Sequence, residues 1–403
     1  MRLFYVSPRD VRKNRADPVH IMKSCAEFAR NGFDVTLITP RVKRNENVPL
    51  ESVWELYGIE KTFRIIELPT FLSDDSWPLT ARLKKFFAFL LFFLYQFGLR
   101  RNRDVLVYSK CYISTIPLIL LKKILLVRVS FFFETASFKK GKRSHAFIAR
   151  NAEGIVLFND YIIQRYMNEY GIPRESIHKA GFPSQIDDFP KEWTEKKLEF
   201  RKKFGLPADK MIVMYAGKFS TESREIDYIV GCAAKKRDIE FVLVGSKEVS
   251  DLHYGAKLKQ KGITNVKLFR HQPVTHFFQY LCSADILLSY YDSGDEISIY
   301  QRTPAKLGLY FISKRPVILA DLPSMREIAN DDMVFFVPPN DIGALAKTIS
   351  WVAQNPMEAE RRALNAFRFA KKNSYRDSYM GVTGFLKRSV LFQSENHRWI
   401  ESP

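Results

Sequence analysis

Short apolar runs alternate with helical stretches along the whole chain, and this alternation limits the fold more than any other feature. Strands separated by helices are typical of parallel sheets whose faces are covered by helices. The first series of predicted strands comprises 3–6, 35–38, 64–68, 105–108, 129–133 and 154–158. The second series comprises 211–216, 241–244, 266–269, 286–289, 317–319 and 334–337. A chain of 403 residues is longer than a domain with a single hydrophobic core usually is, so we expect an α/β protein with two doubly wound domains.

The predicted domains divide near Pro183. Residues 1–183 form the first predicted domain, and the polar, proline-punctuated segment 184–194 is predicted to be a linker. Residues 195–375 form the second predicted domain, and the tail 376–403 is predicted to be helical. In open α/β sheets, ligands bind beyond the carboxyl ends of the strands, so two such domains facing each other would provide for two substrates.

The first predicted helix carries clear end signals. Asp17 is a residue type that caps helix starts, Pro18 suits the first helical position, and Gly32 suits the end. Ile21 and Cys25 recur at helical spacing and predict one buried face. A strand follows this helix at once, so the chain opens with a strand–helix–strand unit of a parallel sheet.

The net charge of +19 is concentrated in the first half of the chain. Residues 1–183 contain 30 Lys and Arg against 17 Asp and Glu, a net charge of +13, whereas the remaining residues contain 33 against 27, a net charge of +6. Such an excess suits anionic partners, namely nucleic acid, an anionic membrane or a phosphorylated ligand. No known nucleic-acid module is recognisable, so a nucleic-acid partner is not expected.

The apolar run from Phe86 to Leu99 is bounded by basic residues on both sides. It spans 14 residues, fewer than the roughly 20 that cross a bilayer, so it is not predicted to be a transmembrane helix. Two interpretations stay open. The run could lie in the interface of an anionic membrane, or it could be a buried core helix with basic ends.

The four cysteines are isolated from one another and show neither disulfide nor metal-ligand spacing. We expect them to be buried, reduced thiols. The chain opens on a strand and shows no signal peptide, which predicts a cytoplasmic protein. The four are Cys25, Cys111, Cys232 and Cys282.

Several stretches of the second half resemble the donor domain of the retaining glycosyltransferases of family 4. The resemblance lies in 211–219, 224–227, 241–245 and above all 303–328. Within 303–328, the residues that match the family pattern are Thr303, Pro304, Lys306, Leu307, Tyr310, Pro316, Val317, Ile318, Arg326 and Glu327. Weaker similarity in 18–23 and 29–35 extends the resemblance over most of the chain. It implies the GT-B architecture, with two facing Rossmann-like domains and a C-terminal helix that crosses back to the first.

The resemblance also implies how a nucleotide-sugar donor would be bound. Lys218, which follows Gly217, and Arg224 match the family's cations, which would stabilise the diphosphate leaving group during catalysis. The backbone of Thr303, Pro304, Ala305 and Lys306 would hold the same phosphates. Gly245 and His271 stand where the family places the nucleotide.

Two positions depart from the family pattern. Family members usually have two glutamates eight positions apart, one near the transferred sugar and one on the donor ribose. Gln301 and Leu309 occupy these positions. A glutamine can still contact sugar hydroxyls, but a leucine accepts no hydrogen bond from a ribose.

Glu134 and His20 are the candidates on the acceptor side. Glu134 ends the apolar run 129–133, where the family often places a carboxylate or histidine facing the acceptor, so it could orient an acceptor hydroxyl. A structural alternative pairs Glu134 with Lys139 or Lys140. His20 could point toward the same acceptor or serve only the helix face.

The sequence therefore predicts a retaining glycosyltransferase with a nucleotide sugar as co-substrate and no metal or other cofactor. The acceptor would be a glycan or a lipid-linked glycan of cell-surface polysaccharide or glycolipid synthesis. The enzyme would work in the cytoplasm, with peripheral contact to the inner face of an anionic membrane through its basic first domain. The alternative is a non-catalytic binding or partner subunit with the same fold, which has lost the donor glutamates.

Overall fold

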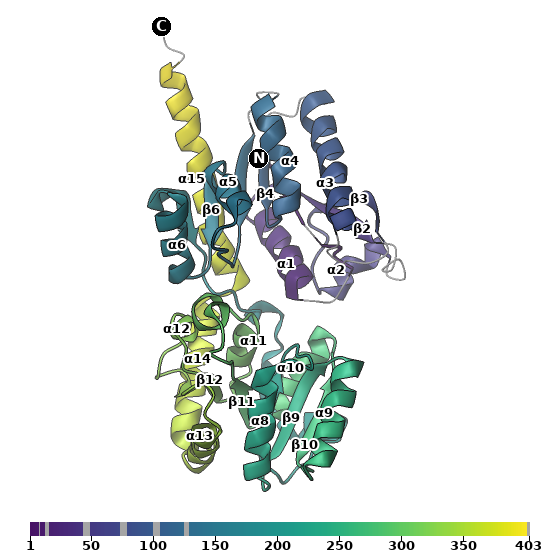
Figure 1. Cartoon of the computed structure of the whole chain (residues 1–403), viewed down its shortest axis with the longest axis vertical. Coiled ribbons are helices and arrows are strands. Elements are labelled where there is room, and N and C mark those ends of the chain that lie inside the picture. The colour runs from purple at the N-terminus through teal and green to yellow at the C-terminus, as the bar shows by residue number, and fades with distance from the viewer. Residues whose placement is uncertain are drawn as a thin grey trace. The chain divides into compact units, whose positions relative to one another are not determined.

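The computed structural model describes residues 1–7, 9–12, 16–42, 49–72, 79–99, 105–124 and 129–400. The chain divides into two units (Figure 1). The first comprises Met1–Gly181 together with the chain from Tyr375 onward, and the second comprises Phe182–Ser374. Each unit has one parallel sheet covered by helices, as the alternating pattern predicted.

The sheet of the first unit has seven strands in the order β3-β2-β1-β4-β5-β6-β7, and every neighbouring pair is parallel. The strands are β1 (Arg2–Val6), β2 (Asp34–Val42), β3 (Arg64–Leu72), β4 (Val105–Ser109), β5 (Ser130–Glu134), β6 (Gly154–Leu157) and β7 (Ile177–Lys179). Six of them were predicted. The edge strand β7 was missed because its three residues include His178 and Lys179 and form no apolar run.

Helices cover both faces of this sheet. They are α1 (Ala16–Arg30), α2 (Val53–Leu56), α3 (Leu79–Phe93), α4 (Tyr112–Ile124), α5 (Arg143–Arg150), α6 (Asp160–Tyr170) and α15 (Tyr375–Ile400). Helix α15, the predicted tail helix, packs against α1, whereas α4 packs between α3 and α5. A π-helical segment, Leu94–Leu99, continues α3.

The start of α1 differs from the prediction. The helix already includes Ala16, so Asp17 lies in its first turn and is not the capping residue. A carboxylate in the first turn still interacts favourably with the helix dipole. Gly32 follows the helix end with φ +90, the left-handed conformation expected there.

The second unit has a six-stranded parallel sheet in the order β10-β9-β8-β11-β12-β13. Its strands are β8 (Ile212–Ala216), β9 (Glu240–Ser246), β10 (Val266–Arg270), β11 (Ile286–Ser289), β12 (Val317–Ala320) and β13 (Phe335–Val337). All six coincide with predicted runs. Five of them are buried over most of their length, which is why they read as largely apolar stretches, whereas the edge strand β10 is only partly buried and carries Lys267 and Arg270.

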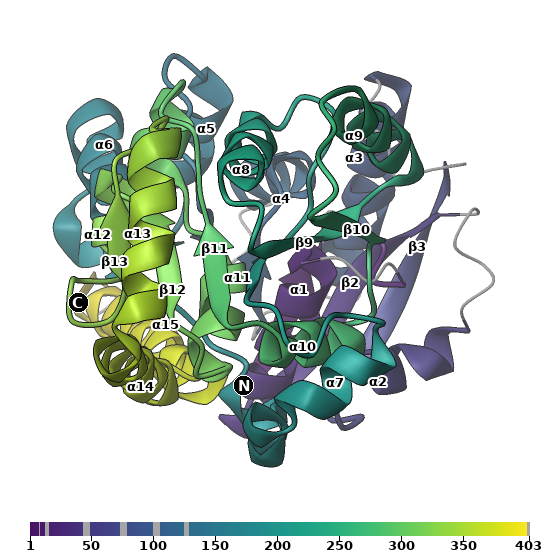
Figure 2. The ribbon, with the colours of Figure 1, turned by 90° about the horizontal axis from the view of Figure 1, so that it is seen from below.

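The helices of the second unit also lie on both faces of its sheet (Figure 2). They are α7 (Lys197–Lys203), α8 (Arg224–Lys235), α9 (Glu248–Gln260), α10 (Val274–Ser283), α11 (Lys306–Ile312), α12 (Pro323–Arg326), α13 (Ile342–Gln354) and α14 (Pro356–Lys372). Helix α13 packs on α8, α10 on α7, and α14 on α11. The segment 184–194 belongs to this unit, where Phe189 is buried against Phe278 and Trp193.

All four cysteines are free and buried, as predicted. Among the described residues, no helix combines the length and the apolar character that crossing a membrane requires.

Candidate functional site

The order of strands in the second sheet reverses between β8 and β11. The chain proceeds from β8 outward to β10 and then restarts at β11 on the other side of β8. In doubly wound sheets, the crevice at the carboxyl ends of two such strands is where ligands bind. Here β8 and β11 pair only through Val213–Ile286 and Met214–Leu287.

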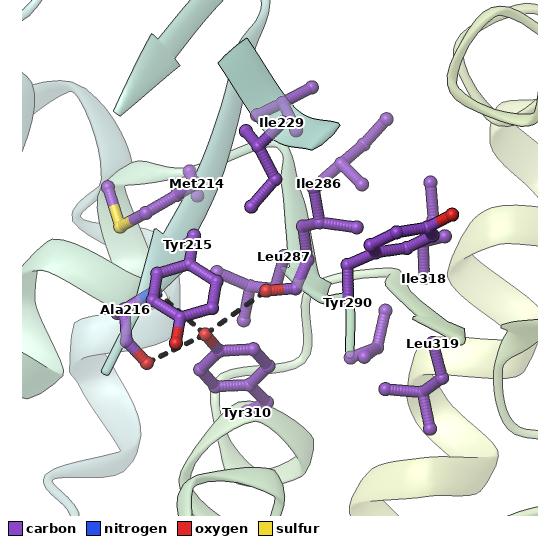
Figure 3. Close-up of a cluster of buried hydrophobic side chains, with 14 of the residues drawn as sticks. Met214, Tyr215, Ala216, Ile229, Ile286, Leu287, Tyr290, Tyr310, Ile318 and Leu319 are labelled. Atoms are coloured by element: carbon purple, nitrogen blue, oxygen red, sulfur yellow. Dashed lines mark hydrogen bonds between the residues drawn. The ribbon is translucent and has the colours of Figure 1, made fainter. Parts of the chain in front are cut away.

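Tyr310 joins the two strands beyond their last pair. Its hydroxyl donates to the carbonyl oxygen of Ala216 at 2.8 Å and accepts from the amide of Ala216 at 2.8 Å (Figure 3). The carbonyl oxygen of Leu288 on β11 lies 3.4 Å away. This contact explains physically why a tyrosine stands at the position that matches the family pattern.

The loops after β8 and β9 touch at two glycines. Gly245 has φ +119, and a Cβ there would lie 2.4 Å from the carbonyl oxygen of Gly217. Only glycine tolerates both the backbone conformation and this close approach. Of the two glycines predicted at the donor site, Gly245 is therefore required for this close approach, whereas a Cβ on Gly217 would come closest to the flexible side chain of Lys306, at 3.2 Å.

Lys306 lies against the same loop. A Cβ on Gly217 would lie 3.3 Å from its Nζ, which sits 3.9 Å from the ring centroid of Tyr215 and 4.7 Å from that of Tyr291. Burial foremost, opposed by Glu225 and reinforced by the nearby Arg302, lowers the pKa of Lys306 to about 7. The aromatic faces attract the ammonium group, but no carboxylate among the described residues is within ion-pair distance of it.

Two arginines converge on the loop after β11. The guanidinium of Arg302 lies 4.5 Å from the ring centroid of Tyr291, and Nη1 of Arg224 is 3.3 Å from Oδ2 of Asp292. Thr303, next to Arg302, has a buried hydroxyl with no hydrogen-bond partner among the described residues. Cations beside an unsatisfied hydroxyl form a surface that suits a phosphate group.

The other predicted donor residues take different positions in the second unit. Lys218 is exposed directly after Gly217, and Pro304 is buried while Ala305 is exposed. His271 is exposed after β10, and its backbone N–H donates to the carbonyl oxygen of Ser246 at 3.1 Å. Arg302, Tyr215 and Tyr291 were missed, although Arg302 directly precedes the recognised Thr303–Pro304 pair.

The two positions that depart from the family pattern also differ in environment. Gln301 is buried at the end of the π-helical segment Ile297–Gln301. Leu309 lies on α11 and packs against the hydrophobic core of the unit.

The lowered pKa of Lys306 predicts that any nucleotide bound beside it is held with an affinity that depends on pH. If the protonated amine binds a nucleoside diphosphate, the dissociation constant should rise about fivefold between about pH 7 and about pH 8, as an amine with a pKa of about 7 loses its proton. Lys306→Arg, which keeps its charge, should remove this dependence. Calorimetric titration with nucleoside diphosphates between about pH 7 and about pH 8 measures both effects, and a flat profile in the wild type would contradict the prediction.

In the first unit, a buried carboxylate gathers residues from four elements. Glu134, at the carboxyl end of β5, is fully buried, and each of its oxygens has two partners. Oε1 accepts from Nζ of Lys110 at 2.8 Å and from Nε2 of His20 at 2.9 Å. Oε2 accepts from the hydroxyls of Tyr108 at 2.5 Å and Tyr379 at 3.3 Å. These contacts use about all the acceptor positions of a carboxylate.

Neighbouring charges determine the protonation states of Glu134 and His20 in this cluster. Burial by itself would raise the pKa of Glu134, but Lys110 foremost and the His20 contact outweigh it and hold the pKa far below its ordinary value. Burial and then Lys110 lower the pKa of His20, so His20 is neutral near pH 7. We therefore assign the proton to Nε2, which faces Glu134, and Nδ1 accepts from the hydroxyl of Tyr375 at 3.2 Å.

Glu134 and His20, the two residues predicted on the acceptor side, are hydrogen-bonded to each other in this cluster. The proposed partners Lys139 and Lys140 were wrong, because the partner is Lys110, which extends from the end of the neighbouring strand β4. His20, Tyr375 and Tyr379 tie α15 to α1 and the sheet. Sequence reasoning missed Lys110, although it follows an apolar run just as Glu134 does.

Within the part of the chain that the structure describes, no three His, Cys, Asp or Glu side chains are close enough to hold a metal ion.

The fold defines the class first. Two Rossmann-like units with a C-terminal helix on the first constitute the GT-B architecture that the resemblance implied. Sucrose-phosphate synthase from Thermosynechococcus elongatus superposes with a TM-score of 0.76 at 15% identity, over 97% of this chain and 99% of that one. A glycosyltransferase from Rickettsia africae gives 0.70 at 14% identity, over 96% and 98%. HepE from Anabaena, solved with UDP and glucose, gives 0.70 at 12% identity, over 96% and 100%.

The family similarity is narrower than the fold. Residues 210–355, which include the switch point of the second sheet, match the family model of the group 1 glycosyl transferases. No curated protein matches the chain at the sequence level.

Proposed function

We propose that this protein is a glycosyltransferase that moves a sugar from a nucleotide sugar to a glycan or lipid-linked acceptor with retention of configuration, as in family 4. The observation that carries the proposal is the convergence of Lys306, Arg302 and Arg224 on the switch point of the second sheet. This site lies in the segment that matches the family model. HepE has been solved with UDP-glucose, which makes UDP-sugars the first donors to test.

The chemistry follows from the charges. As the bond between sugar and diphosphate breaks, negative charge builds on the leaving phosphate oxygens, and cations already in place stabilise it. Arg224 can leave its exposed contact with Asp292 for a phosphate at small cost. Lys306, with a pKa of about 7, takes up a proton when a diphosphate approaches its aromatic cage, so its charge appears as the ligand binds.

The acceptor is proposed to be bound by the first unit. Because both oxygens of Glu134 are occupied, the carboxylate would act there as a positioning residue that fixes His20 and Lys110. Neutral His20 would orient an acceptor hydroxyl through Nδ1, where the acceptor would take the place of the Tyr375 hydroxyl. WaaG, a solved structure with a TM-score of 0.65, takes part in lipopolysaccharide biosynthesis, which supports cell-surface glycans as the acceptor class.

The test is a transfer and hydrolysis assay with a panel of nucleotide sugars, together with calorimetric titration of the nucleotides. The proposal expects UDP or another nucleoside diphosphate to bind and one of its sugars to be turned over. Absence of both nucleotide binding and sugar turnover would refute the proposal that this protein is a glycosyltransferase.

A second candidate is a non-catalytic subunit that keeps the fold. It is favoured by Leu309, which packs on the core and has no group for a ribose hydroxyl, and by the uncharged Gln301. Nucleotide binding without turnover, in the presence of a broad set of acceptors, would support this candidate over the enzyme.

The proposed location is the cytoplasm, at the inner face of the membrane. This location would suit a lipid-linked acceptor.

A further inference from the structure

Helix α3 carries two apolar rows on opposite sides. The buried row includes Ala81, Phe89 and Phe93, which pack into the first unit. The second row is offset from it by two residues, about 200° around the helix axis. It is exposed, and it consists of Leu79, Leu83, Phe87 and Leu91 on α3 and of Tyr95 in the π-helical segment that continues the helix.

The buried row confirms the interpretation of the run as a core helix for one side of α3, and the membrane interpretation stays a prediction for the other side. One side is a core helix, and the other presents large apolar side chains away from the core. Leu79, Phe87 and Leu91 are 72%, 55% and 66% exposed. Single exposed apolar residues are common, but a row of five at four-residue spacing marks an interaction surface.

Helix α4 extends this surface. It packs beside α3 (Figure 1), and its last turns expose Leu120 and Ile124, by 39% and 72%. Both helices lead back to the amino ends of strands, since β4 follows α3 and β5 follows α4. The C-terminal ends of the two helices, which carry Leu91, Leu120 and Ile124, therefore lie at the amino end of the strands.

The charge on these helices selects the partner. The sequences of α3 and α4 contain three and two basic residues and no acidic one. Arg82, Lys84 and Lys123 are exposed among them. A second copy of the chain would bring like charges together in a two-fold contact and offer no carboxylate from these helices. An anionic bilayer suits both the charged and the apolar side chains of these helices. Its headgroups attract the cations, and its acyl boundary receives leucine and phenylalanine.

We propose that α3 and α4 dock the protein on an anionic bilayer, with the exposed row inserted at the headgroup boundary and the lysines and arginine on the lipid phosphates. This inference identifies the surface through which the protein would contact the membrane at the location proposed above. It does not rest on glycosyl transfer, because bilayer binding needs neither donor nor acceptor.

The test compares vesicle co-sedimentation of the full chain and of two matched variants. Leu83→Gln/Leu91→Gln removes two members of the exposed row without changing charge. Val249→Gln/Leu252→Gln is the control, because these α9 residues are equally exposed, at 69% and 72%, in the second unit. The vesicles are phosphatidylcholine alone and phosphatidylcholine mixed with phosphatidylglycerol.

The wild type and the control should bind the anionic vesicles more tightly than the neutral ones, and salt should weaken this binding. Leu83→Gln/Leu91→Gln should bind at least about tenfold more weakly, because two leucines no longer transfer from water. Its thermal unfolding and its donor binding should match the wild type, so a failure of docking is separate from a failure of the proposed activity.

Two results would overturn the proposal. One is equal binding of both variants to the anionic vesicles, or no binding by the wild type. The other is a wild-type dimer in sedimentation velocity that Leu83→Gln/Leu91→Gln dissociates, without vesicle binding by either protein. That result would assign the row to a second copy of the chain.

Discussion

Glu134→Gln is expected to lower the free energy of unfolding of the first unit by about 3 kcal/mol, because it leaves Lys110 without its charge partner in a largely buried position. Glutamine keeps the size of the side chain but has one acceptor oxygen in place of two, so Tyr108 and Tyr379 also lose their acceptor. Urea unfolding at pH 7 measures the effect. The loss should be visible as an earlier transition of this unit.

Two further variants separate charge from shape. Lys110→Met added to Glu134→Gln should recover much of the lost stability, since the buried charge is then gone from both sides. Asp34→Asn is the control in the same sheet, because its ion pair with Arg64 is exposed and should be worth less than about 1 kcal/mol. A loss that Lys110→Met does not relieve, or one no larger than that of Asp34→Asn, would show that the Glu134–Lys110 pair does not stabilise the unit.

The same cluster sets a dependence on pH. The pKa of Glu134 is held well below its ordinary value of 4.5 in the folded protein, so its ionisation stabilises the fold fully above about pH 4.5. That stabilisation declines as pH falls toward the folded-state pKa. The difference between the wild type and Glu134→Gln should therefore be constant near neutrality and shrink in acid.

Lys218→Ala/Arg224→Ala is expected to lower turnover of the preferred nucleotide sugar by about 10²-fold or more, the loss typical when a group that stabilises developing charge is removed. Lys218 lies in the loop after β8, directly after Gly217, and Arg224 is the first residue of α8. Both are exposed, and the ion pair of Arg224 with Asp292 lies at the surface of the loop, so folding should be nearly unchanged. Steady-state kinetics measures turnover, and calorimetry with UDP measures how much of the loss comes from weaker binding of the nucleotide in the ground state.

A control pair removes the same two residue types from the opposite edge of the sheet. Lys210→Ala/Arg237→Ala changes positions that precede β8 and β9, where parallel sheets do not bind ligands. It should leave turnover within about twofold of the wild type, as for ordinary surface charges. Equal kinetics in the site pair and the control pair would refute the assignment of Lys218 and Arg224 to the leaving diphosphate.

The arrangement of charged partners was decided by the tertiary structure alone. Lys110 and Glu134 are far apart in sequence and meet because β4 and β5 are neighbours in register. In the same way, Arg302 and Lys306 meet Tyr215 and Tyr291 only because β11 returns to the side of β8. No local pattern contains the strand order, so the partners of Lys110, Tyr108 and Arg302 could not be predicted from the sequence.

The exposure of α3 is a similar case. Its sequence is apolar on two sides, and periodicity cannot tell which side a sheet covers. The structure buries Phe89 and Phe93 and leaves Leu83 and Leu91 outside. That division confirms the core interpretation for one side of α3 and leaves membrane contact of the other side as a proposal.

The sequence by itself determined the two α/β units, twelve of the thirteen strands and the glycines of the switch-point loops. The physical reason is that strands buried on both faces must be continuously apolar, and that Gly217 and Gly245 meet where a side chain would not fit. Which charges pair, which lysine is caged by aromatic rings and which face of α3 stays exposed depend on contacts between distant segments. Those contacts are set by the packing of the sheets and helices, and only the tertiary structure decided them.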